Sequence, residues 1–270
     1  MGMKCKIAAA AGGLMLAGAQ SMSPGAAAPD FQRLEPRTAI ERSELAIGRS
    51  LGDHHLVDAA GMQVRLRDYR GKPLVISLVY TSCSSVCPPT TQHLIDAVNE
   101  AGRIIGLGQF NVLTVGFDAR HDTPARLKQF ASSQGIKFAN WRLASADASA
   151  IDALLRNLGF SYMAVAGGFD HVTQTTIVDA EGNIYRHVYG DDFPLQMFIE
   201  PLKNVVYGTT AVGSLTGFLD RVKFICTVYD PGAGRYRIDY GLAFGSVLAG
   251  LSLLLMGGLI MREWLRAGHA

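Results

Sequence analysis

The segment "LVISLVYTSCSSVCPPTT", residues 74–91, joins an apolar run to two cysteines and two prolines. The run over 74–80 is nearly continuous in its apolar character, which is typical of a central strand buried on both faces. The prolines suit the first turn of a following helix. Cys83 and Cys87 therefore lie at a predicted strand-to-helix junction, four residues apart, and their side chains are expected to face the same way.

Three kinds of chemistry are open to this pair of cysteines. Two thiolates can hold one soft metal ion, and with a modest adjustment they can also form a structural or a redox-active disulfide. A helix N-terminus favours thiolate over thiol because its N–H groups and dipole stabilise negative charge. The spacing suits rapid disulfide exchange less well, because three residues separate these cysteines whereas two separate the usual pair of a thioredoxin-type oxidoreductase. A structural disulfide closing so small a loop would add little stability.

Strands and helices alternate through the rest of the central region. This order predicts a layered α/β domain with a mixed central sheet flanked by helices, spanning 47–205. The expected strands cover 63–66, 74–80 and 110–118 and form a hairpin within 173–190, and the expected helices follow residue 87 and cover 123–133, 145–160 and 194–205.

Both ends of the chain predict an exported, anchored protein. Two lysines, an apolar run and the small residues Ala17, Gly18 and Ala19 are typical of a secretory signal peptide over 1–19. The uncharged segment 241–261 has the length of a transmembrane helix. Two arginines follow it, so the positive-inside rule predicts a cytoplasmic tail at 262–270.

The remaining segments are predicted to connect these parts. Residues 20–46 are rich in Ser, Pro and Ala and are expected to form a flexible tether. Residues 206–240 are expected to form a membrane-proximal linker that contains Cys226. We expect a bacterial inner-membrane protein whose soluble domain lies in the periplasm.

The charge of the chain argues against a nucleic-acid partner. Its 270 residues carry a formal net charge of +2. They contain no long basic run, and no patch of lysine or arginine interleaved with aromatic residues, that would match a phosphate backbone.

Three stretches together resemble the Sco/SenC family of copper chaperones. They are "YTSCSSVCP" from Tyr80, "VGFDARHDTPARLKQFA" from Val115 and "FDHVTQTTIVDAEGNI" from Phe169. The resemblance implies a thioredoxin-like fold and one copper ion held by two cysteines and a distant histidine. It also implies a role in assembling the CuA centre of cytochrome c oxidase, with subunit II of the oxidase or a similar cuproprotein as recipient and another protein as copper donor.

Carried onto this chain, the resemblance assigns Cys83, Cys87 and His171 as copper ligands, with Asp170 directly before the histidine. Copper(I) prefers soft thiolates and accepts imidazole, so this donor set distinguishes copper from hard cations. The chain departs from the family at Ser84, where proline is common, and in placing its predicted anchor at the C-terminus. Copper affinity and docking could differ for that reason.

Alternatives to copper delivery stay open. The same two cysteines could serve a thiol–disulfide oxidoreductase that reduces target cysteines before metallation, although we expect a carrier more than an enzyme. A copper or redox sensor is a third reading. Cys226 is either an added ligand or relay thiol, or an incidental buried cysteine. His93 could orient the site from one turn away, and the pair His54 and His55 is expected to lie at the surface.

Overall fold

The computed structural model describes residues 34–83, 85–208, 227–230, 235–238 and 240–267. Within the first two ranges, one seven-stranded sheet has the order β2-β1-β5-β4-β3-β8-β9. Its three central strands β3, β4 and β5 are parallel, and the outer strands pair antiparallel. The strands are β1 (His55–Asp58), β2 (Gln63–Arg65), β3 (Leu74–Val79), β4 (Asn111–Gly116), β5 (Trp141–Ser145), β8 (Gln174–Val178) and β9 (Ile184–Tyr189).

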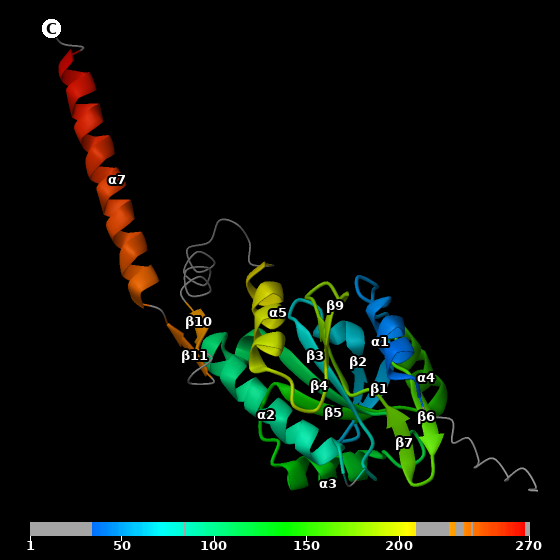
Figure 1. The fold of residues 1–270 in the computed structure, drawn as a ribbon. Helices are drawn as coiled ribbons and strands as arrows, with labels where there is room; N and C mark the ends of the chain where they lie inside the picture. Colours follow the sequence, from blue (N-terminus) through cyan, green and yellow to red (C-terminus); the bar gives the residue numbers. More distant parts are fainter. Residues whose placement is uncertain (1–33, 84, 209–226, 231–234, 239, 268–270) are drawn as a thin grey trace, which may run out of the picture. The chain divides into compact units, whose positions relative to one another are not determined.

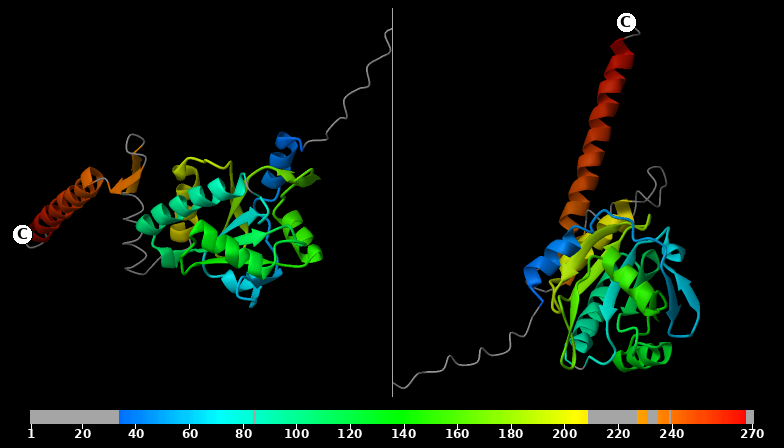
Figure 2. Two further views of the ribbon diagram at one scale, coloured as in Figure 1. Left: turned by 90° about the horizontal axis from the view of Figure 1, so that it is seen from below. Right: turned by 90° about the vertical axis from the view of Figure 1, so that its right-hand side faces the viewer.

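Helices cover both faces of this sheet, as the sequence predicts (Figure 1). Helix α2 contacts both α3 and α5, whereas α1 and α4 lie together beside the other face (Figures 1 and 2). The long helices are α1 (Pro36–Glu44), α2 (Cys87–Ile104), α3 (Pro124–Gln134), α4 (Ala148–Asn157) and α5 (Leu195–Gly208), and short 3-10 turns occupy Leu66–Tyr69 and Leu107–Gln109.

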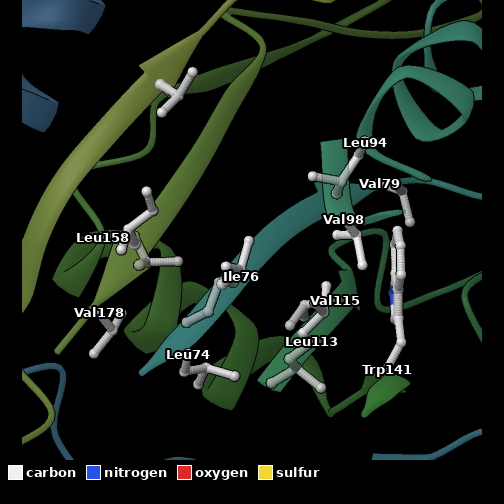
Figure 3. Packing of buried hydrophobic residues seen from close by; sticks show 14 of the residues in the cluster. Leu74, Ile76, Val79, Leu94, Val98, Leu113, Val115, Trp141, Leu158 and Val178 are labelled. Carbon is white, nitrogen blue, oxygen red and sulfur yellow. The ribbon is translucent and has the colours of Figure 1, made fainter. Parts of the chain in front are cut away.

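The core lies between α2 and the central strands. Figure 3 shows Leu94 and Val98 of α2 directed toward side chains of β3 and β4, among them Ile76 and Val115. These side chains are all at most 2% exposed. Burial of strand β3 on both faces explains its apolar run and fixes the point at which the following cysteines emerge.

Polar side chains inside the sheet satisfy one another. The hydroxyl groups of Ser77 and Thr114 share a hydrogen bond of 2.7 Å between β3 and β4. The indole N–H of Trp141 donates to the Thr114 hydroxyl at 3.0 Å. Thr114 is 1% exposed, so this small network replaces water for three polar groups on neighbouring strands.

A second, two-stranded sheet carries the predicted histidine ligand. Its strands β6 (Tyr162–Val165) and β7 (Gly168–His171) form a hairpin between α4 and β8. Neither strand was expected from the sequence. His171 is the last residue of β7.

The predicted tether is wrong for part of its length, because Pro36–Glu44 form α1. Proline suits the first turn of a helix, and the Glu35 carboxylate accepts a hydrogen bond from the Arg37 N–H at 3.4 Å. Ala39 and Ser43 are buried on the inner face. A predominantly polar segment therefore adds a helix to the domain, which begins before residue 47.

The C-terminal region contains a hairpin and a long helix. Strands β10 (Thr227–Asp230) and β11 (Arg235–Ile238) pair within the predicted linker, and α7 covers Tyr240–Ala267. The helix expected at 241–261 is confirmed, but its assignment as transmembrane is not. Among the described residues, no helix combines the length and the apolar character needed to cross a membrane. The predicted signal peptide and Cys226 lie outside the described residues.

Replacing Thr114 with valine should destabilise the domain. The change keeps the shape of the side chain but leaves the buried Trp141 N–H and the Ser77 hydroxyl without their shared partner, which costs about 1–3 kcal/mol. Urea unfolding of the two proteins measures the difference. Thr38→Val, at an exposed position of α1, is the control and should change the free energy of unfolding by less than about 0.5 kcal/mol. Equal losses in both variants would contradict the buried network.

Candidate functional site

Cys83 and Cys87 lie where strand β3 passes into helix α2. Cys83 is in the connecting loop and Cys87 is the first residue of the helix, and both are buried free thiols. The backbone N–H of Cys87 donates to Cys83 Sγ at 3.3 Å, and the N–H of Cys83 donates to the Tyr80 carbonyl at 3.0 Å. Because the first N–H groups of a helix have no partner within it, the Cys83 sulfur takes up one of these free donors.

The two thiols have opposite acidities. Burial alone would raise the pKa of Cys83, but hydrogen bonds from the Cys87 N–H, the Tyr80 hydroxyl, the Cys87 thiol and the Ser85 N–H outweigh it and lower this pKa to about 6. Burial, with the neighbouring Cys83 sulfur, raises the pKa of Cys87 to about 12. Cys83 is therefore a thiolate near neutral pH, and Cys87 is a protonated thiol beside it.

Asp122 fixes the loop that presents Cys83. Its carboxylate is 2% exposed and accepts the N–H of Thr81 at 2.7 Å through Oδ1 and the N–H of Asp118 at 2.9 Å through Oδ2. Burial raises the pKa of Asp122 even though these N–H groups favour its charged form. One side chain thus connects the loop after β3 with the loop after β4.

His171 is half-buried at the end of β7. Its Nδ1 lies 3.3 Å from the Val172 carbonyl, which favours a proton on Nδ1 and leaves Nε2 with a free lone pair. Burial lowers the pKa of His171, and this effect outweighs the Val172 carbonyl and the Asp170 carboxylate, which both raise it. The imidazole is therefore neutral at pH 7, the form that can bind a metal ion.

Tyr80 connects the dithiol with the hairpin that carries His171. Its hydroxyl helps to lower the pKa of the Cys83 thiol, its carbonyl accepts the Cys83 N–H, and its ring lies edge-on to His171 with centroids 6.1 Å apart. Phe117 and Phe160 also contact the imidazole, at 5.6 and 5.5 Å between centroids. The histidine is held in an aromatic enclosure that limits its contact with water.

The structure brings the two predicted cysteine ligands together and places His171 on the neighbouring hairpin. Across the described ranges, no group of three or more His, Cys, Asp or Glu side chains is placed so that it could hold a metal ion. Asp170, directly before His171, accepts the N–H of Leu34 at 3.0 Å, so the chain entering α1 is attached to the same hairpin.

The other histidines singled out in the sequence have separate partners. His93 Nε2 is 2.7 Å from the Phe193 carbonyl, so its ring is held by the loop before α5. His54 Nε2 lies 3.2 Å from the Asn157 side chain, and His55 is exposed at the start of β1.

Sequence reasoning missed Tyr80 and Asp122 as parts of the site. Both residues stand inside the quoted motif stretches, Tyr80 three positions before Cys83 and Asp122 in the segment from Val115. Their position inside these stretches was the only feature of the sequence that could have pointed to them. Neither type of residue is a preferred ligand for a soft metal ion, so a search for ligands passes over them.

Alkylation of Cys83 should report its low pKa. Because the thiolate is the nucleophile, the rate of reaction with iodoacetamide should rise with pH through a midpoint near 6 in the folded protein. Cys87 should stay unmodified over this range because its pKa lies near 12. Peptide mass spectrometry after timed alkylation identifies the modified cysteine. In denaturant both midpoints should move to about 8.5, and a folded-state midpoint for Cys83 already at that value would contradict the assignment.

The fold is similar to those of several solved structures. A crystal structure of a candidate electron transfer protein from Aquifex aeolicus is 27% identical, with a TM-score of 0.56 over 63% of this chain and 99% of the other. BsSco, described as a member of the Sco family of cytochrome c oxidase assembly proteins, is 20% identical with a TM-score of 0.53 over 60% and 95% of the two chains. This likeness confirms the predicted thioredoxin-like α/β domain.

Copper is present in solved structures of Sco proteins. The structure of Bradyrhizobium japonicum ScoI contains bound copper; it is 21% identical, with a TM-score of 0.48 over 57% of this chain and 98% of the other.

Curated relatives give the same family. The SCO1 protein homolog of Bacillus subtilis is 29% identical over 83 residues, which span 30% of this chain and 41% of that protein. The SCO2-like protein of Rickettsia conorii is 26% identical over 162 residues, which span 57% of this chain and 75% of that protein. The family model for SCO1/SenC matches residues 45–206, more than half of the chain. The chain, with its buried dithiol at the start of α2 and its histidine on the adjoining hairpin, belongs to the SCO1/SenC family.

Proposed function

We propose that this protein is a copper metallochaperone that binds one copper ion through Cys83, Cys87 and His171. The observation that carries the proposal is the position of two buried thiols at a helix N-terminus, beside a hairpin that presents a neutral imidazole. Thiolate sulfur and imidazole nitrogen are donors that suit copper and exclude hard cations. In this proposal copper is the cargo and the residues above hold it in transit.

The acidities of the two thiols support reversible binding. Cys83 is already deprotonated near neutral pH, so it can accept a metal ion without first losing a proton. Cys87 must lose its proton when it joins the site, because its pKa in the metal-free protein is near 12. Copper binding should therefore release a proton from Cys87, and protonation of Cys87 would help release copper to a recipient.

The recipient we propose is the CuA site of cytochrome c oxidase subunit II or of a related respiratory cuproprotein, with a separate protein as copper donor. Membership of the SCO1/SenC family supports this assignment, as does the description of BsSco as belonging to a family of oxidase assembly proteins. We also propose that the domain works outside the cytoplasm, at the periplasmic side of a bacterial inner membrane. The export signal read in residues 1–19 supports that location.

A thiol–disulfide oxidoreductase is the second candidate function. The observation that favours it is the pairing of an acidic thiol, Cys83, with a protonated one, Cys87, because such a pair supplies a nucleophile and a resolving thiol. This function requires no contribution from His171.

Copper titration of the reduced full-length chain tests the proposal. Competition with a copper(I) chelator should show one tightly bound copper per protein in the wild type. His171→Ala should weaken binding tenfold or more, because a ligand is lost, and Cys83→Ala should weaken it further. His55→Ala is the matched control, since this imidazole is exposed on β1, and it should bind copper like the wild type.

Two other results of the copper titration would contradict the proposal in different ways. Full copper affinity in His171→Ala would remove the histidine from the site. Weak binding in every protein, together with disulfide reductase activity that survives in His171→Ala, would instead support the oxidoreductase.

In the source organism, deletion of this gene should lower the amount of oxidase that contains CuA. The spectrum and activity of the oxidase in membranes measure the loss. The wild-type gene should restore both, and the Cys83→Ala gene should restore neither because it lacks a copper ligand. Unchanged CuA content after deletion would contradict the proposed recipient.

A further inference from the structure

A group of aromatic side chains around Phe117 connects the sheet with the hairpin that carries His171. The ring of Phe117 contacts each of the other members, with centroids 5.3–5.6 Å apart. These members are Tyr80 after β3, Phe160 before β6, Tyr162 on β6, and Phe169 and His171 on β7. Phe117 therefore contacts both strands of the hairpin as well as the loop that leads to Cys83.

The backbone attaches Phe117 firmly to the sheet. This buried residue directly follows β4, and its N–H donates to the carbonyl of Val79, the last residue of β3, at 2.9 Å. The N–H of the next residue, Asp118, donates to the buried Asp122 carboxylate at 2.9 Å. The main chain on both sides of the ring is thus held by contacts that do not involve the hairpin.

The hairpin itself has no such backbone attachment to the sheet. Among the described strands, β6 and β7 pair only with each other, so side-chain contacts decide where the hairpin lies. The rings of Phe169 and His171 meet the Phe117 ring edge-on, at interplanar angles of 63° and 83°. Contacts of this geometry between aromatic rings are favourable and directional.

We propose that Phe117 is a positioning residue that holds the His171 hairpin against the sheet and orients the imidazole before copper arrives. The edge-on contact at 5.6 Å limits how the imidazole can turn. The contacts with Tyr162 and Phe169 keep the two strands of the hairpin in place. This inference rests on the proposed copper-binding function.

The position of the hairpin has a consequence for copper affinity. If the hairpin were loosely held, copper binding would have to order it, and the cost of that ordering would weaken the complex. A ring fixed at the end of β4 removes part of this cost. The contribution of Phe117 to copper affinity therefore acts through His171 and should vanish when that histidine is absent.

Phe117→Leu in the full-length chain tests this role. Leucine keeps a buried apolar side chain but lacks the ring, so the protein should fold without the edge-on contacts. Hydrogen exchange of peptides covering 162–172 should become faster in the metal-free variant. Copper(I) affinity should fall by about threefold to tenfold, the range expected for the loss of one such ring contact. In a His171→Ala background, the same substitution should cause no further loss of affinity.

Phe130→Leu is the matched control. Phe130 lies on α3, outside this aromatic group, and is buried to a similar degree, at 7% exposed against 3% for Phe117. This variant should keep the hairpin exchange and the copper affinity of the wild type even if urea unfolding shows a lower stability. Should Phe117→Leu fail to fold, Phe169→Leu removes the same 5.3 Å ring contact from the side of the hairpin and should have the same effects.

The outcomes separate this inference from the proposed function. Wild-type hairpin exchange in Phe117→Leu would overturn the role of Phe117, and so would wild-type copper affinity or an equal loss of affinity with and without His171. Absence of copper binding in the wild type would overturn the proposed function instead. Hydrogen exchange of the metal-free proteins would still decide whether Phe117 holds the hairpin.

Discussion

The hydrogen bond from the Cys87 N–H to the Cys83 sulfur is the interaction on which the site depends. It exists because the loop that follows a buried parallel strand brings the Cys83 sulfur to the first turn of a helix, where N–H groups have no partner within the helix. The same bond supplies part of the stabilisation that keeps Cys83 ionised within an apolar region. Acidity, burial and the direction of the chain at this point therefore have one structural origin.

The sequence predicted the strands and helices that have long apolar runs or a clear apolar face. Buried strands such as Leu74–Val79 have nearly continuous apolar runs, and α4 has a clear apolar face ending with Leu155 and Leu158. The strands missed were short or partly exposed. Strand β6 has the apolar sequence YMAV, but it is only four residues long and three of them are exposed, so its pattern does not distinguish a strand from a loop. Helix α1 was missed because only two of its residues are buried.

The sequence predicted which side chains could donate to a soft metal ion. It did not predict the hydrogen bonds and the acidities of those side chains. Cysteine spacing showed that two sulfurs could face one another, and family resemblance supplied His171. The asymmetry in acidity arises from contacts that no spacing reveals, since the bonds of Tyr80 to Cys83 and of Asp122 to Thr81 depend on how loops from different strands meet.

The bond between the Leu34 N–H and the Asp170 carboxylate has a practical meaning for work with this protein. It joins the beginning of the described domain to the residue that precedes His171. Any polypeptide fused ahead of Leu34 would therefore start beside the histidine hairpin and could crowd the approach of a second protein. A shortened version that begins after this position would lose the bond and leave the hairpin with one fewer attachment. The choice of first residue is thus a choice about the metal site as well as about the fold.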